Sequence, residues 1–230
     1  LSSPVQGKIG ESFNYNSMNT YMLVAIIDRK CGVGFEKYLE TKLFEPLGIT
    51  GTYWEKSPAG LPKGGWGLYM KPEDMAKLGQ MVMDGGVWKG RRIVPEDYLK
   101  QALSRQAAVP EDYGDFDYGF QIWCGRKKNS FLFNGMMGQN VLAFCDNRII
   151  LVTNGGCEDN FQQSNYFKYA ARYFGGKIKD GTARNDTEYR GLGKYIGSLS
   201  AYKTSPSIHG RREWKKNKDR LTAGAFVILR

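Results

Sequence analysis

The stretch NVLAFCDNRIILVT, residues 140–153, decides the fold of this 230-residue chain. Its two apolar runs, 140–145 and 148–153, are rich in branched and aromatic side chains, as β-strands are. The pair Asp146-Asn147 between them favours a tight hairpin, because both residue types tolerate turn conformations. The stretch therefore predicts two adjacent antiparallel strands.

The sequence on either side of this hairpin predicts helices first and further strands later. Two more strands are expected at 118–124 and 131–134, and a helix at 161–174. Upstream, the apolar spacing and the Pro and Gly punctuation predict helices at 18–31, 34–45, 72–84 and 95–103. Helices, then an antiparallel run, then one packing helix is the order of an α+β domain.

Two of these helices carry specific expectations. The first has apolar residues at Met18, Met22, Ala25 and Ile26, and Leu23 and Ile27 extend this stripe. We therefore expect the helix to be mostly buried and to end at Gly32. The second is expected to stop at Pro46.

The domain organisation follows from composition. Residues 1–176 are expected to form one domain, with a helical region at about 13–105 and strands with a final helix at about 117–175. Residues 177–230 form a basic linker and tail, or the start of an add-on segment. This tail has 13 Lys and Arg against five Asp and Glu, so it holds eight of the ten net positive charges.

Composition also excludes several kinds of chemistry. The single histidine, His209, lies in the tail, so a hydrolase on this domain uses another base and histidine-based zinc sites are disfavoured. The four cysteines lack C-x-x-C spacing and are expected to be buried free thiols. The apolar runs are too short to cross a bilayer. The compartment stays open, since no leader can be recognised.

The first candidate for catalysis is Tyr15, in the sequence Phe13-Asn14-Tyr15-Asn16-Ser17 just before the first helix. A tyrosine followed two residues later by a small polar side chain can act as a general base when a nearby ammonium favours the phenolate. Ser17 as a simple helix cap explains the pattern equally well.

The second candidate is the sequence FNGMMGQ, residues 133–139, at the end of one strand and the start of the next. Glycines within a strand pair mark a close approach to the backbone. A backbone N–H held there by the strand ladder suits an oxyanion hole. A bulge or a tight strand connection is the alternative.

The ordered motifs of residues 8–175 resemble the serine β-lactamase/penicillin-binding protein superfamily, and most closely its class C-like esterase and amidase branch, of the 6-aminohexanoate-dimer hydrolase type. The motifs are FxYxSxNT from Phe13, LFEPLGI from Leu43, GGxGL from Gly64, PxDxAxxG from Pro72, GxWxG from Gly86, YGFxxW from Tyr118 and GxxGQ from Gly135.

The resemblance implies a β-lactamase/transpeptidase-like α+β fold whose sheet is incomplete in this chain. Tyr15 would be the catalytic tyrosine, and Ser17 would fill the Asn or Ser position of the family's Tyr-x-Asn. Met136 would supply the oxyanion N–H. Substrate would contact Asn134, Gly135, Gln139 and Trp66, and Trp123 is a further wall candidate.

Two departures from the family pattern matter. Phe133 stands where a penicillin-recognising enzyme has lysine, which argues against β-lactamase activity. The nucleophilic S-x-x-K is absent upstream of Tyr15. The one match, Ser200-Ala201-Tyr202-Lys203, lies in the tail and is expected by chance, so we expect the nucleophile on a segment not present in this chain.

The leading hypothesis is a serine hydrolase that cleaves a small ester or amide through an acyl-enzyme, although this chain alone would be inactive. The alternative is a non-catalytic homologue that acts as a binding or sensing module. No cofactor, metal, nucleic acid or membrane span is expected. A weaker hypothesis has the run Arg211–Arg220 contact nucleic acid or anionic lipid, and a solvated charged end is favoured over it.

Overall fold

The computed structural model describes residues 10, 12–111, 114–155, 163–176, 190 and 224–229. The predictions for Cys157, Ser200–Lys203, His209 and the basic run lie outside these residues. Contacts divide the chain into two units, Leu1–Gly176 with Ala223–Arg230, and Lys177–Thr222. No helix among the described residues is long and apolar enough to span a membrane.

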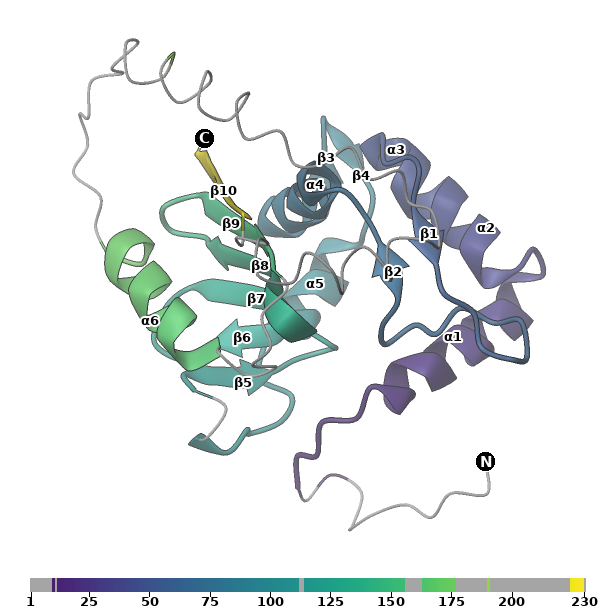
Figure 1. Cartoon of the computed structure of the whole chain (residues 1–230), viewed down its shortest axis with the longest axis horizontal. Helices are drawn as coiled ribbons and strands as arrows, with labels where there is room; N and C mark the ends of the chain where they lie inside the picture. The colour runs from purple at the N-terminus through teal and green to yellow at the C-terminus, as the bar shows by residue number, and fades with distance from the viewer. Residues whose placement is uncertain are drawn as a thin grey trace, which may run out of the picture. The chain divides into compact units, whose positions relative to one another are not determined.

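The first unit contains one six-stranded antiparallel sheet and a helical region (Figure 1). The strand order is β10-β9-β8-β7-β6-β5. The strands are β5 (Phe116–Tyr118), β6 (Trp123–Gly125), β7 (Ser130–Gly135), β8 (Gln139–Phe144), β9 (Ile149–Asn154) and β10 (Gly224–Leu229). The element order confirms the α+β prediction.

The β8–β9 hairpin is buried on both faces of the sheet. Val141 faces Val152 and Ala143 faces Ile150 in the strand register, and these residues belong to one core cluster. The alternate residues, such as Leu142 and Leu151, belong to a second cluster on the other face. The predicted Asp146-Asn147 turn is present, at the centre of a four-residue connection closed by the Arg148 N–H and the Cys145 carbonyl at 3.2 Å.

Helix α4 (Pro72–Met83) covers the first face of the hairpin. It begins with proline and two acidic residues, as predicted, because their charge and fixed φ suit a helix N-terminus. Gly79 allows its close approach, since an added Cβ would lie 2.8 Å from Val141 Cγ1. After the helix, Asp84 bonds Arg148 at 2.6 Å and so ties α4 to the end of the hairpin.

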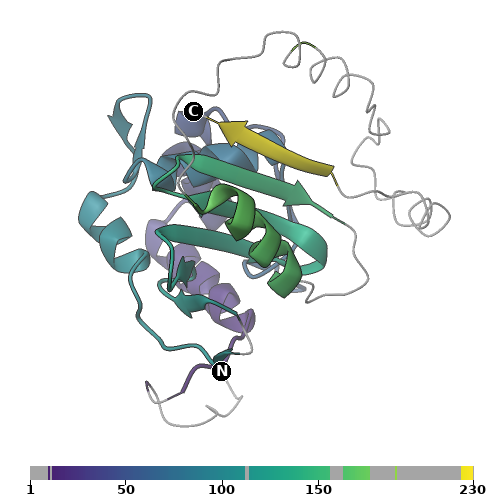
Figure 2. The same ribbon diagram turned by 90° about the vertical axis from the view of Figure 1, so that its left-hand side faces the viewer.

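Helix α6 (Gln163–Phe174) covers the opposite face (Figure 2). Its Ala170 is buried in the second cluster, and Phe167 and Phe174 pack against that cluster. The long helix predicted at 161–174 is thus confirmed over its described part.

The strand β10 pairs with β9 over six residues, from Gly224 opposite Asn154 to Leu229 opposite Ile149. The sequence placed 223–229 within a single tail of 177–230, but contacts join this segment to the first unit. The pairing has a physical reason, because β9 is buried along Ile149–Thr153 and would otherwise expose an unpaired strand edge.

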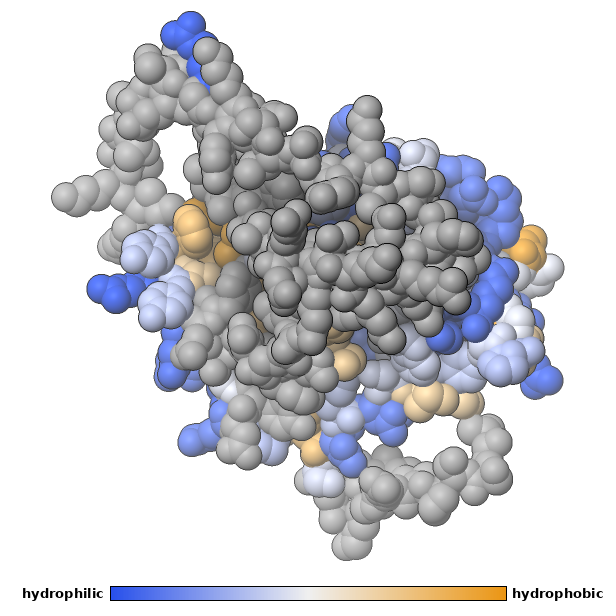
Figure 3. Space-filling model, in the orientation of Figure 1, coloured by the Kyte–Doolittle hydropathy of each residue, from blue (hydrophilic) through white to orange (hydrophobic). Residues whose placement is uncertain are grey.

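Helix α1 (Met18–Cys31) has the predicted bounds, and Gly32 ends it in the left-handed conformation. The prediction that it is mostly buried is wrong. Only Val24 is buried, whereas Leu23 and Ile26 are 44% and 52% exposed. Figure 3 shows apolar side chains over α1 and the turn that follows it. Periodicity alone could not reveal that little of the described chain packs against this stripe.

The second predicted helix continues past Pro46. Helix α2 (Phe35–Leu39) passes into a π-helical turn, η1 (Glu40–Phe44), and then into α3 (Glu45–Leu47), which ends at Gly48. Proline is tolerated because it lies in the first turn of α3, where its missing N–H has no helical partner to lose. Short hairpins and one further helix complete the region, namely β1 (Tyr53–Trp54) with β2 (Leu68–Tyr69), β3 (Val87–Trp88) with β4 (Arg91–Arg92), and α5 (Glu96–Ala102).

The strand predicted at 118–124 is in fact two strands. Residues 119–122 form the turn between β5 and β6, in which Gln121 has a φ of 61°. The Gly119 N–H donates to the Ile122 carbonyl at 2.8 Å, and this bond closes the turn. The whole segment 118–124 is rich in apolar and aromatic residues, so its composition does not indicate that the chain reverses direction within it.

We predict that Gly79→Leu lowers the free energy of unfolding by about 1–3 kcal/mol, because the added side chain would force α4 away from β8. Urea denaturation followed by circular dichroism measures this change. The matched control is Gly176→Leu, at a glycine with no atom within 4 Å of an added Cβ, and it should change stability by less than about 0.5 kcal/mol. Equal effects of the two substitutions would contradict the proposed packing.

Candidate active site

A groove of about 390 Å³ lies between the helical region and one end of the sheet. The loop before α1, the Gly64-Gly65 segment, α4 and strands β5 to β7 all contribute to its walls. Its lining residues are Tyr15, Thr20, Leu43, Gly64, Gly65, Leu78, Met81, Val82, Tyr118, Gln121, Ile122, Trp123, Phe133 and Asn134. The groove thus joins the two segments that the sequence marked separately, around Tyr15 and around Asn134.

Tyr15 is held by aromatic neighbours on the sheet. Its ring stacks on Trp123 with centroids 5.9 Å apart and planes at 23°, and meets the Tyr118 ring edge-on at 6.2 Å. Trp123 and Tyr118 are register partners on β6 and β5, so they form a rigid platform. Tyr15 itself remains 43% exposed, and its phenol is therefore accessible from the groove.

The two tyrosines of the groove differ in their surroundings. Tyr118 packs edge-on against Trp123 with centroids 4.8 Å apart, and it is less exposed than Tyr15. Burial, with a smaller contribution from Tyr15, raises the pKa of Tyr118 to about 12. Tyr118 is therefore a poor candidate base, and Tyr15 is the more exposed of the two phenols.

The start of α1 fixes the Tyr15 loop to the sheet. The Met18 N–H donates to Asn16 Oδ1 at 2.9 Å, so Asn16 caps the first turn, and the Ser17 side chain makes no capping bond. Thr20 Oγ1 donates to Gln121 Oε1 at 2.6 Å across the groove wall. Thr20 and Gln121 were missed by the sequence analysis, because their pairing spans 101 residues.

Ser17 does not line the groove. It lies behind the Gly64-Gly65 wall, where a Cβ on Gly65 would be 2.4 Å from the Ser17 carbonyl oxygen. Trp66 follows this wall and is 43% exposed, and its carbonyl accepts a bond from Trp54 Nε1 at 3.1 Å. Trp66 thus lies next to the groove and is not one of its lining residues.

The opposite wall ends in the turn between β7 and β8. Asn134 lines the groove and Gly135 ends β7, and the short helical turn Met136–Gly138 follows. Gly135 pairs with Gln139, and an added Cβ on Gly135 would lie 2.6 Å from the Gln139 carbonyl oxygen. The backbone of Met136 is therefore presented at the end of a fixed strand pair.

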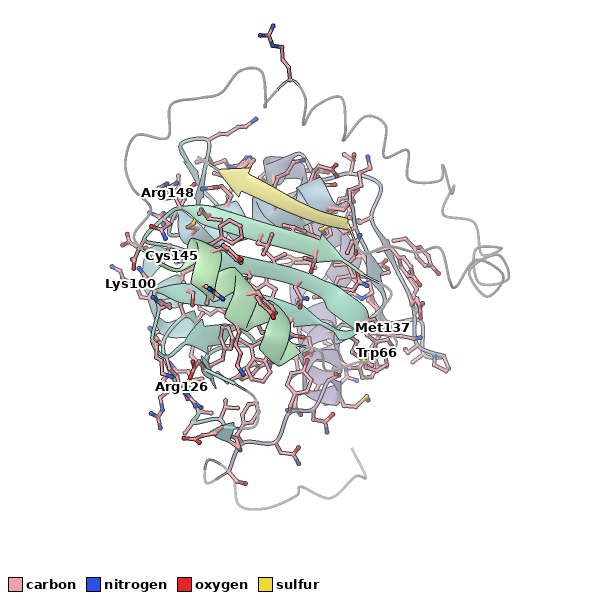
Figure 4. The ribbon with its side chains drawn as sticks, turned by 60° about the vertical axis from the view of Figure 1, so that its left-hand side comes forward. Trp66, Lys100, Arg126, Met137, Cys145 and Arg148 are labelled. Carbon is pink, nitrogen blue, oxygen red and sulfur yellow. The ribbon has the colours of Figure 1, made fainter. Side chains whose placement is uncertain are left out.

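The side chain of Gln139 does not take the substrate-binding position expected from the sequence. Its Nε2 donates to the Gly155 carbonyl, so the amide holds the turn and does not line the groove. Figure 4 shows Met137 at the opposite end of the sheet from Cys145 and Arg148, which mark the β8–β9 connection.

No charged side chain is among the described residues that line the groove. Burial raises the pKa of the Cys124 and Cys145 thiols to about 11, so neither is a thiolate nucleophile at neutral pH. The described residues contain no group of three or more His, Cys, Asp or Glu that could hold a metal ion. The described groove therefore offers phenol, amide and backbone groups to a substrate.

An antiparallel sheet that meets a helical region at a groove is an α+β architecture. The β-lactamase family model matches residues 1–155, and the chain belongs to this family.

Individual relatives agree with this assignment. The 6-aminohexanoate-dimer hydrolase of Paenarthrobacter ureafaciens is 31% identical over 147 residues, which are 59% of this chain and 36% of that protein. The chain thus spans about a third of the curated relative. A solved structure from Bacillus anthracis, provisionally named 6-aminohexanoate-dimer hydrolase, has a TM-score of 0.63 at 18% identity and covers 85% of this chain and 47% of its own. One from Bacteroides dorei DSM 17855, provisionally named β-lactamase, has a TM-score of 0.61 at 16% identity, over 76% and 62% of the two chains.

We predict that Tyr118→Phe reduces the decrease in the free energy of unfolding that accompanies a rise in pH above 10. The folded chain binds the Tyr118 proton more tightly than the unfolded chain, whose tyrosines titrate near pH 10. The contribution of this group to the free energy of unfolding is therefore complete below pH 10 and is lost as the pH rises towards 12. Urea denaturation between pH 9 and 12 measures the difference. Tyr98→Phe, at an exposed tyrosine of α5, should keep the wild-type slope.

Proposed function

We propose that this chain forms the tyrosine and oxyanion walls of a serine hydrolase that cleaves a small ester or amide through an acyl-enzyme. The observation that carries the proposal is that Tyr15 and Asn134 line one groove, although 119 positions separate them, and that Met136 lies two residues after Asn134. Family membership and the 6-aminohexanoate-dimer hydrolase relative support the same class of reaction.

The proposed reaction uses Tyr15 for proton transfer and the Met136 N–H for oxyanion stabilisation. A serine hydroxyl attacks the substrate carbonyl carbon, and Tyr15 accepts the hydroxyl proton. The carbonyl oxygen becomes an oxyanion that the Met136 N–H stabilises. Tyr15 then returns the proton to the leaving alcohol or amine as its bond to the carbonyl carbon breaks. Water hydrolyses the acyl-serine by the same path and regenerates the enzyme.

The nucleophile is proposed to come from an S-x-x-K segment outside these 230 residues. The lysine of that segment would supply the positive charge that a tyrosine phenolate requires, since no charged side chain is among the described lining residues. The apolar part of the groove favours this arrangement. Leu43, Leu78 and Phe133 line it and are only partly buried, which leaves apolar surface for another polypeptide segment to cover.

The absence of a charged lining residue also bears on the substrate. Phe133 lies on the groove wall. By the family resemblance it stands where a penicillin-recognising enzyme has a lysine, which would pair with the β-lactam carboxylate. We therefore propose uncharged ester and amide groups as the substrates, with Trp66 and Trp123 as aromatic contacts near the mouth. Activity on penicillins is not part of the proposal.

The second candidate is a non-catalytic homologue that binds a small molecule in the same groove. The described lining residues of the groove include no serine or cysteine, and a binding module needs no nucleophile. The two candidates differ in one respect, because a binding module retains ligand affinity without turnover.

We predict that Tyr15→Phe in the complete protein lowers kcat for a small ester such as p-nitrophenyl acetate by about 10²- to 10⁴-fold. The substitution removes one exposed hydroxyl, so the melting temperature should change little. Tyr38→Phe, at an exposed tyrosine of α2, is the matched control and should retain full turnover. Turnover that survives Tyr15→Phe would remove Tyr15 from the mechanism, and a complete protein that binds esters without turnover would favour the binding module.

A further inference from the structure

A row of polar residues crosses the sheet at the end that holds the β7–β8 turn. Asn134 on β7 pairs with Asn140 on β8, and Asn140 pairs with Thr153 on β9. Asn140 and Thr153 are 5% and 8% exposed, and the next positions towards the middle of their strands, Val141 and Val152, are aliphatic. Burying polar side chains in such a sheet is costly unless each makes hydrogen bonds.

The hydrogen bonds of this row lead to the turn. Thr153 Oγ1 donates to the Gly138 carbonyl at 2.8 Å and accepts from Asn140 Nδ2 at 3.2 Å. Gln139 Nε2 donates to the Gly155 carbonyl, two residues beyond Thr153. Gly138 is thus bonded to Thr153 on β9, and Gln139 is bonded to Gly155, the residue that follows β9.

The backbone of Gly155 completes this support by contact. An added Cβ there would lie 2.7 Å from the Met137 carbonyl oxygen and 3.3 Å from the Gly138 Cα. The turn needs such support, because Met137 and Gly138 have φ values of 62° and 93°, and the left-handed conformation is unfavourable for methionine.

We propose that Thr153 is a positioning residue that fixes the turn carrying the Met136 N–H. The backbone of Gly155 packs against the same turn and limits its movement. Thr153 does not line the groove, and it acts through the Gly138 peptide rather than on a substrate. The inference rests on the proposed function for the oxyanion role of Met136, but the support of the turn itself is a property of this chain. The support of the turn by Thr153 and the oxyanion role of Met136 can therefore be disproved separately.

The test is nuclear magnetic resonance of the ¹⁵N-labelled chain with Thr153→Val, which keeps the shape and removes the hydroxyl. The Gln139 N–H donates to the Met136 carbonyl within the turn, so its hydrogen exchange should become about five- to ten-fold faster. The Met136 amide signal should also move. Thr153→Ser should restore both, and Asn154→Ala, at the exposed neighbouring position, should leave both unchanged.

Gly155→Ala provides a second route that leaves the hydroxyl intact. Its methyl group would press on the Met137 carbonyl, so the same two amide signals should respond. Unchanged turn signals in both variants, or changes spread evenly over β8 and β9, would overturn the proposal.

In the complete protein, Thr153→Val should lower kcat by about 10- to 100-fold with an unchanged KM, because an oxyanion donor acts in the transition state. If the turn signals move while kcat is unchanged, Thr153 supports the turn and the oxyanion role of Met136 is wrong.

Discussion

The structure depends on the burial of the β8–β9 hairpin from both sides. Alternate residues of the two strands enter two different clusters, one beneath α4 and one beneath α6. A strand pair that is apolar on both faces cannot remain at a solvent-exposed edge, so it specifies a helix above, a helix below and a further strand beside β9. The glycine at position 79 and the pairing of β10 are the local consequences of this constraint.

The same hairpin also supports the proposed site. Its β8 strand starts at the turn that presents the Met136 backbone, and the polar row ending at Thr153 interrupts the apolar pattern only at this end. The second wall of the groove depends on aromatic packing, since Tyr15 precedes the first helix and is oriented by Trp123. In the proposed site, the sheet therefore supplies both the Met136 amide and the Trp123 platform for the Tyr15 phenol.

The sequence predicted most of what local chemistry controls. Helix α1 was predicted with its bounds and Gly32 stop, and residues 140–153 with their turn, because caps, glycines and strand composition act over a few residues. The reversal at Gln121, the exposed stripe of α1 and the paired strand at 224–229 depend on contacts between distant segments, and periodicity does not report these. For the site, Tyr15 and Asn134 share the groove, whereas the bond of Gln139 to Gly155 and the pair Thr20–Gln121 required the structure.

The most direct measurement identifies the serine that a fluorophosphonate probe labels in the complete protein, by peptide mass spectrometry. Our account places the tyrosine and the oxyanion amide in this chain and the nucleophile elsewhere. It therefore predicts one labelled serine, within an S-x-x-K sequence outside these 230 residues. A label on Ser17 or Ser200, or a complete protein that takes up no label, would contradict it.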